Sequence, residues 1–168
     1  MRSRIRPPSI PARIRIVALT ALLCATACGG PLGPFAGGAL SGPAGPAHVD
    51  DWNFAAGEET AQLETNPDHP RSVTIWFATI GPHVYISSSL ILGSSEPSER
   101  GWVQGVVKDS RVRIRIAGAV YERVAVRVED ESEYAIALEA LQTKYGLDPG
   151  ERDPERAIWI YRLDPRSA

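Results

Sequence analysis

The stretch from Ser110 to Val128, SRVRIRIAGAVYERVAVRV, restricts the fold of this chain more than any other. Arginine alternates with aliphatic residues over Arg111–Ile116, as in a strand whose two faces have different surroundings. A second run, Val120–Val128, comes after the short connection Ala-Gly-Ala. Two such runs joined by a tight turn predict an antiparallel hairpin, and therefore a fold built largely on an antiparallel sheet.

The two faces of this hairpin are mixed in character. A turn centred on Ala117-Gly118 sets Glu122 opposite Arg113, whereas a turn centred on Gly118-Ala119 sets it opposite Arg115. Both registers place valines on the arginine face, as happens when a sheet curls into a barrel that helices partly cover. The arginines could bind a phosphorylated cofactor, but charge at strand spacing is typical of a solvated face. We therefore expect them to be scaffold, paired with Glu122.

Other segments carry the patterns of strands and helices. The apolar run Arg71–Ile80 predicts one buried strand that returns as a hairpin after Gly81-Pro82. Acidic residues at its start, Lys144 near its end and Gly146 after it predict a helix over Glu131–Tyr145. Further strands are predicted at Thr60–Thr65, His83–Ser89 and Ala157–Leu163, and a short helix at Trp102–Lys108. The chain is thus expected to be α+β, mainly β, with an antiparallel barrel and two covering helices.

The N-terminus has the features of a secretory signal. Five arginines precede an apolar run, Ile16–Ala27, that is too short to span a bilayer comfortably. A buried core helix is the alternative, and so many arginines at the start of the run disfavour it. We expect residues 1–27 to be a signal peptide.

The two cysteines indicate where the signal is cleaved. Cys28 stands between Ala-Thr-Ala and Gly-Gly, which resembles the lipobox of bacterial lipoproteins, although Ala25 replaces the usual leucine. Cys24 comes after the bulky Leu23 and fits less well. We expect lipid on Cys28, a mature domain without cysteine or disulfide, and attachment to the bacterial cell envelope. Gly29 in place of aspartate favours the outer membrane, on its periplasmic side.

Residues 28–49 are almost entirely Gly, Pro, Ala and Ser up to Pro46. Such a composition predicts a tether that is disordered over residues 29–46, ahead of a barrel domain at residues 50–168. A phosphate-binding loop is the alternative, but the segment lacks the ending Gly-Lys-Ser/Thr.

Charge and histidine content exclude two classes of function. Five of the 18 basic residues precede Cys28, which leaves 13 basic against 20 acidic residues in the mature chain. A charge of −7 argues against nucleic-acid binding, which needs a basic surface. The three histidines, His48, His69 and His83, have no paired spacing, so no metal site is expected.

The segments Ser72–Ser89 and Glu99–Val128 together resemble the split β-barrel superfamily of pyridoxamine 5′-phosphate oxidases and deazaflavin-dependent nitroreductases. Those proteins have a strand hairpin, a loop with a basic residue, a short helix ending in an acidic-Pro-Arg-Val segment, and two more strands. Here the last segment reads KDSRV, with Ser110 in place of proline. The resemblance covers about Thr60–Val128 and implies a split barrel, a small-molecule oxidoreductase activity and a homodimer.

The resemblance also implies a phosphate-binding site for flavin mononucleotide (FMN) or a deazaflavin. An arginine, hydroxyl groups and a helix N-terminus that converge on one place suit a phosphate. Two features depart from the family pattern, namely Gly105 and the Ser/Pro-rich loop Leu90–Glu99. No catalytic side chain is identified, because the cofactor would supply the redox chemistry. The candidate cofactor-binding residues are Arg71, Ser87, Ser88, Arg100, Trp102 and Gln104.

Export leaves other functions open. The signal has no twin-arginine pair, only Arg13-Ile14-Arg15, so it implies passage through the membrane unfolded. An unfolded chain cannot carry a non-covalently bound cofactor, which would have to be acquired outside the cytoplasm. The alternatives are a non-catalytic module that binds haem or another small molecule, and a barrel without cofactor that acts in envelope interactions.

Overall fold

A computed structural model describes residues 29–91, 96–151 and 155–166. The predicted signal peptide and Cys28 lie outside the described residues. In the described part of the chain, no helix is long and apolar enough to cross a membrane.

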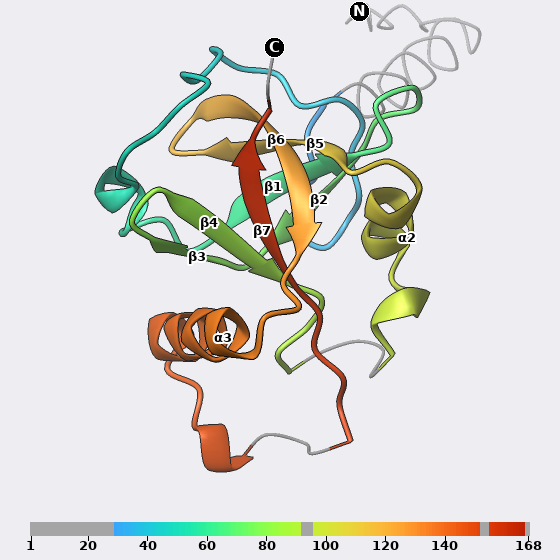
Figure 1. Ribbon diagram of the computed structural model, residues 1–168. Coiled ribbons are helices and arrows are strands. Elements are labelled where there is room, and N and C mark those ends of the chain that lie inside the picture. Colours follow the sequence, from blue (N-terminus) through green and yellow to red (C-terminus); the bar gives the residue numbers. More distant parts are fainter. Residues whose placement is uncertain (1–28, 92–95, 152–154, 167–168) are drawn as a thin grey trace, which may run out of the picture.

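Seven strands form one antiparallel sheet in the order β2-β1-β5-β6-β7-β4-β3. The sheet curls on itself into a barrel (Figure 1), and the predicted mainly-β split barrel is confirmed. The strands are β1 (Ala61–Thr65), β2 (Arg71–Ile75), β3 (Phe77–Ile80), β4 (His83–Ser87), β5 (Arg111–Ile116), β6 (Ala119–Arg127) and β7 (Ile160–Pro165).

The predicted single strand Arg71–Ile80 is wrong. The run is divided at Trp76 into β2 and β3, which pair with β1 and β4 and form the two edges of the sheet. Ile75 and Phe77 are both buried in the core while Trp76 is only partly buried, so the alternation of the strand continues through the break. Alternation of apolar and polar residues shows which face of a strand is buried, but not which strand it pairs with. The sequence pattern therefore does not indicate that the pairing partner changes at Trp76.

Two helices cover the barrel, as expected: α2 (Gly101–Lys108) and α3 (Glu131–Tyr145). Asp130 caps α3 by accepting a hydrogen bond from the Glu133 amide at 2.8 Å. Gly146 ends it in the left-handed conformation, with φ 61°. Figure 1 shows α3 lying across one end of the sheet, and α2 at the side of the barrel, apart from α3. Three short 3₁₀ turns occupy Asn53–Ala55, Pro97–Glu99 and Pro149–Glu151.

The core has two parts. Inside the barrel, side chains from the sheet meet α2 and the indole of Trp52. Outside it, Ala137 and Leu141 of α3 pack with Ala78 and Ile160 of the sheet. The barrel core contains Trp52, Leu63, Phe77, Val84, Ile86, Val103, Val112, Ile114, Ile116 and Leu163 among its buried side chains.

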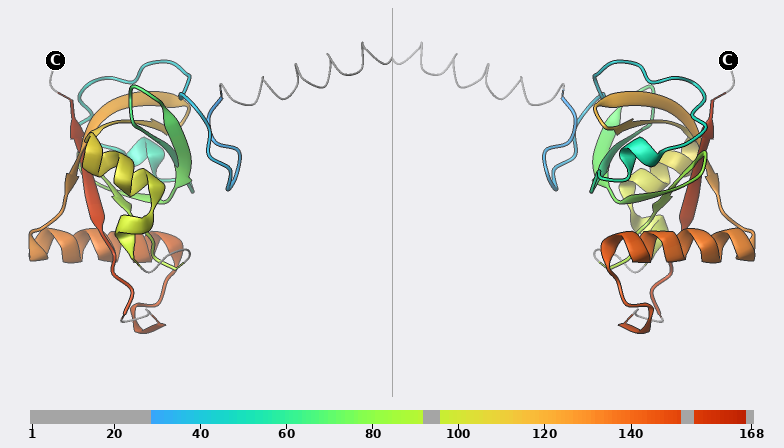
Figure 2. Two further views of the ribbon diagram at one scale, coloured as in Figure 1. Left: turned by 90° about the vertical axis from the view of Figure 1, so that its right-hand side faces the viewer. Right: turned by 90° about the vertical axis from the view of Figure 1, so that its left-hand side faces the viewer.

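Residues 29–49, which we call the strap, lie along the outside of the barrel (Figure 2). Gly37 pairs with Ser72 of the edge strand β2, and Ala44 pairs with Val120 of β6. Leu40 is buried. The expectation of a disordered tether over residues 29–46 is therefore wrong. Its backbone amides and carbonyls find partners on the barrel, which offsets the entropy of ordering a segment so rich in glycine.

A glycine in the strap allows the close approach. The Gly45 amide donates to the Val120 carbonyl at 2.8 Å, and a Cβ atom at Gly45 would overlap the Tyr121 ring. Glycine is a sign of flexibility in the sequence, but here its missing side chain lets the strap backbone lie against the Tyr121 ring.

The hairpin of β5 and β6 turns at Ala117-Gly118, whose φ angles are 48° and 82°. This register sets Arg113 opposite Glu122. The ion pairs are different, however, because Arg113 binds Glu64 of β1.

Glu122 instead meets Arg166, while Arg115 donates to the Ser41 carbonyl at 3.2 Å. The expected pairing of the strand arginines with Glu122 on a solvated face is therefore wrong. The strap covers part of that face, and Arg115 helps to hold it.

Candidate functional site

A pocket of about 390 Å³ opens between the edge strand β2, the end of β4 and the start of α2. Four of the six residues proposed from the sequence line it: Ser87, Ser88, Arg100 and Trp102. The volume lies in the range of ordinary small-molecule sites. The remaining lining residues are Pro34, Val73, Thr74, Ile75, Trp76, Ser89, Leu90 and Ile91.

Arg100 gives the pocket its positive charge. It is the residue that caps the N-terminus of α2, so its side chain starts where the helix amides point outward. Partial burial lowers the pKa of Arg100, and the neighbouring positive charge of Arg156 lowers it further. Arg100 thus brings one guanidinium group to the pocket wall beside the N-terminus of α2, and both the charge and the helix end favour anions.

The serines place hydroxyl groups at the end of β4. Ser87 and Ser88 are 5% and 3% exposed. The Ser88 hydroxyl accepts a hydrogen bond from the Trp159 amide at 3.0 Å, and the Ser88 amide donates to the Trp159 carbonyl at 2.8 Å. Because this hydroxyl accepts from Trp159, its own proton can be donated to a ligand oxygen.

Two indoles are the aromatic part of the wall. Trp102 lies edge-on to Tyr161 inside the barrel, with ring centroids 5.7 Å apart. Trp76 stacks on Tyr145 of α3 at 4.1 Å and an interplanar angle of 9°. Both rings are held by packing, which suits a planar aromatic ligand.

The described part of the pocket lining contains no carboxylate, imidazole, thiol or amine. It can bind and orient a molecule, but it supplies no proton donor or acceptor that titrates near neutral pH. It also contains none of the side chains that usually ligate haem iron.

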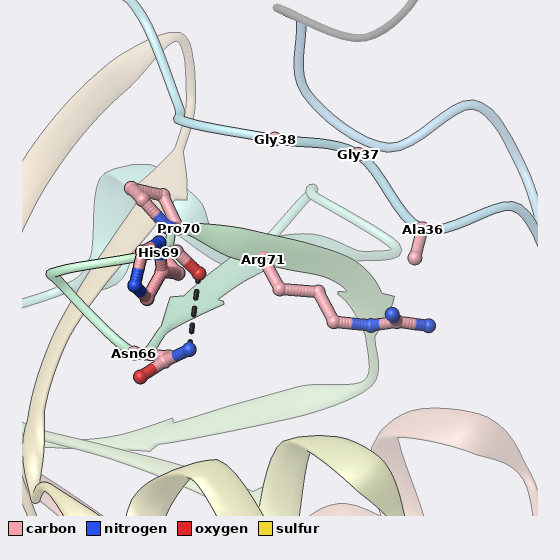
Figure 3. A pocket seen from close by; sticks show the side chains of 7 residues that line it. All are labelled: Ala36, Gly37, Gly38, Asn66, His69, Pro70 and Arg71. Carbon is pink, nitrogen blue, oxygen red and sulfur yellow. Dashed lines mark hydrogen bonds between the residues drawn. The ribbon is translucent and has the colours of Figure 1, made fainter.

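The structure does not bring the other two candidates into this pocket. Arg71 begins β2 and lines a separate hollow of about 440 Å³ beside the strap, where its side chain extends toward Ala36 (Figure 3). In the same hollow, the Asn66 side chain donates to the His69 carbonyl at 3.1 Å. Gln104 lies on α2 and donates to the Ser98 carbonyl at 3.0 Å, away from the lining residues.

The eight remaining lining residues and Arg156 were not among the candidates from the sequence, and three of these residues matter most to the pocket. Trp76 was assigned to the middle of a strand, and Pro34 to a disordered tether. Arg156 lies in a loop about 56 positions from Arg100, and no local pattern links the two. Among the described residues, no group of three or more metal-ligating side chains is found.

No protein-family model matches the sequence, and no curated protein matches it. Solved structures do. A conserved hypothetical protein, Rv2991 of Mycobacterium tuberculosis, has 17% identity and a TM-score of 0.51, with 74% of this chain and 86% of that chain covered. A putative pyridoxamine 5′-phosphate oxidase from Listeria innocua has 18% identity and a TM-score of 0.49, with 66% and 86% covered. An F420-H2 dependent reductase has 17% identity and a TM-score of 0.45, with 64% and 95% covered.

These identities are all below one fifth, so a likeness among the proteins is one of fold alone. This chain shares its fold with the Mycobacterium tuberculosis protein, whose TM-score is 0.51.

Proposed function

We propose that this chain is a lipid-anchored envelope protein that binds a flavin or deazaflavin and acts as an oxidoreductase on a small molecule. The observation that carries the proposal is the lining of the 390 Å³ pocket, where Arg100, Ser88 and Trp102 meet. Arg100 and the α2 N-terminus would hold the anionic part of the cofactor, with the Ser88 hydroxyl as a further donor. The indoles would flank its ring system.

The absence of acid and base groups from the described lining fits this role. A bound flavin or deazaflavin supplies hydride transfer itself, so the protein has only to position it, shield it and set its electrostatic surroundings. Arg71 and Gln104 are left out of the proposed cofactor site, since neither lines this pocket.

A non-catalytic binding module is the second candidate, favoured by the same lack of titratable groups. Of its variants, haem is the less favoured ligand because the described lining offers no axial ligand. A small anionic aromatic molecule fits the lining better.

The second part of the proposal is the lipid anchor. Cys28 would carry the lipid at the outer membrane, on the periplasmic side, and the protein would work there as a homodimer. Light scattering of the purified full chain would measure the oligomeric state.

The deciding experiment is an absorption spectrum and mass analysis of protein purified from its native envelope, followed by titration with FMN and with a deazaflavin. A flavin or deazaflavin band, or saturable binding of either compound, is expected. A colourless protein that binds neither would retire the oxidoreductase function, and saturable binding of another aromatic anion would then favour the binding module.

A further inference from the structure

The strap begins with a small hairpin that carries two exposed apolar side chains. Leu32 and Phe35 exchange both of their backbone hydrogen bonds, each at 3.1 Å, around a turn of Gly33 and Pro34. Their side chains are 81% and 73% exposed, the highest values among the large hydrophobic residues of the described chain. We call residues 31–36 the apolar hairpin.

The turn of the apolar hairpin is held against the barrel. The Thr74 hydroxyl of β2 donates to the Gly33 carbonyl at 3.1 Å, and within the strap the Gly38 amide donates to the Gly29 carbonyl at 2.9 Å, which closes the base of the hairpin. Figure 2 shows the hairpin, in blue, projecting from the barrel beside the sheet. Two large apolar side chains that stay exposed on a hairpin held in place indicate that they meet something outside the barrel.

The position of the hairpin in the chain identifies its partner. Leu32 comes only four residues after Cys28, a distance of at most about 14 Å when the chain is fully extended. A lipid on Cys28 therefore holds Leu32 and Phe35 at the membrane surface. Leucine and phenylalanine next to a polar backbone are typical of segments that bury their side chains at the boundary of headgroups and acyl chains.

The charge beside the hairpin suits the same surface. Arg71 is exposed, and its side chain extends toward Ala36 at the end of the hairpin (Figure 3). A cation at this position would lie at the level of the phosphate groups of anionic phospholipids.

We propose that the apolar hairpin inserts Leu32 and Phe35 into the lipid headgroup region and so fixes the orientation of the barrel on the membrane. This rests on the proposed lipid anchor at Cys28. Pro34 of the same hairpin lines the candidate pocket, so that pocket opens beside the bilayer surface. The small molecule on which the proposed cofactor acts would then be an amphiphile dissolved in the membrane.

The test uses the full chain, expressed in bacteria with a photo-crosslinking phenylalanine analogue at position 35, or in a second variant at position 32. The matched control carries the analogue at Ile136, which is 56% exposed on α3. Purified protein is reconstituted into phosphatidylethanolamine–phosphatidylglycerol vesicles and irradiated, and its adducts are identified by mass spectrometry. Intact mass reports separately whether Cys28 carries lipid.

Phospholipid adducts at positions 32 and 35, with none at 136, are expected. A covalent dimer from either hairpin position would overturn the inference in favour of an interface between two copies. Lipid on Cys28 without any phospholipid adduct at the hairpin would overturn the inference alone. A chain without lipid on Cys28 would remove the anchor and this inference together, and cofactor titration would still test the pocket.

Discussion

Glu64 and Arg113 form a bidentate ion pair across β1 and β5, with Arg113 Nε and Nη2 lying 2.8 Å and 2.6 Å from the two carboxylate oxygens. Glu64 is 4% exposed and also accepts a hydrogen bond from the Leu40 amide of the strap. The pair thus links the sheet to the strap through one buried carboxylate, and the hydrogen bonds to Glu64 hold the pKa of Arg113 above its usual value.

Arg113→Ala should lower the free energy of unfolding by about 2–4 kcal/mol, because it leaves the Glu64 charge buried without its partner. Urea unfolding measures the loss. Arg111→Ala is the matched control, since Arg111 pairs with Asp109 at the surface and should cost less than about 1 kcal/mol. Equal losses in both variants would show that Arg113 is an ordinary surface residue.

Gly45→Ala should destabilise the protein by about 1–3 kcal/mol, because the new methyl group would overlap the Tyr121 ring. Limited proteolysis should then cut within the strap before the barrel. Gly57→Ala is the control, since a Cβ atom there meets nothing within 4 Å. A strap that stays protected in Gly45→Ala would contradict the close packing.

Arg100→Ala should weaken FMN binding about 10- to 100-fold, as expected for the loss of a charge-assisted hydrogen bond to phosphate. Fluorescence titration measures the affinity. Arg71→Ala removes an arginine from the neighbouring hollow and should leave the affinity unchanged. Equal losses from the two variants would place the phosphate elsewhere.

Tyr85 should make stability sensitive to alkali. Burial, together with the hydrogen bond it donates to Glu133 at 3.0 Å, raises its pKa to about 12. Between pH 10 and 12 the folded chain keeps a proton that the unfolded chain has lost, so the free energy of unfolding falls as pH rises. Tyr85→Phe should show a shallower fall in urea unfolding across this range. Identical slopes would mean that Tyr85 ionises as it does in the unfolded chain.

Cys28→Ala should abolish lipid labelling and release the protein from membranes. Metabolic labelling with a fatty acid, followed by membrane fractionation, tests both effects. Cys24→Ala is the control and should leave labelling intact. If the wild type takes up no lipid and fractionates with the cytoplasm, the proposed anchor is wrong.

Much of the fold could be predicted because it depends on local patterns. Alternation located β5 and β6, and the charge distribution with Gly146 located α3. The change of strand partner at Trp76 could not be predicted, because burial keeps alternating from Ile75 through Trp76 to Phe77. The ordered position of the strap could not be predicted either, because glycine and proline are abundant both in free linkers and in segments that pack closely on a barrel.

The site was predictable only where its residues belong to elements that the resemblance covers. Ser87, Ser88, Arg100 and Trp102 lie at the end of β4 or the start of α2, and they meet in one pocket. Arg71 was expected with them because the family that the sequence resembles often has an arginine at the start of its first long strand. Its side chain instead extends beside the strap, a segment whose position no pattern in the sequence indicates.

The strap is the first part of the described chain to be synthesised, yet it depends on strands made much later. Ala47 accepts a hydrogen bond from Arg123, which lies 76 positions further along the chain. At about 5–20 residues per second, roughly 4–15 s separate the synthesis of the two residues. Throughout that interval the strap has no β6 to lie against. The strap can therefore take up its ordered position only after β5 and β6 have been made and have paired.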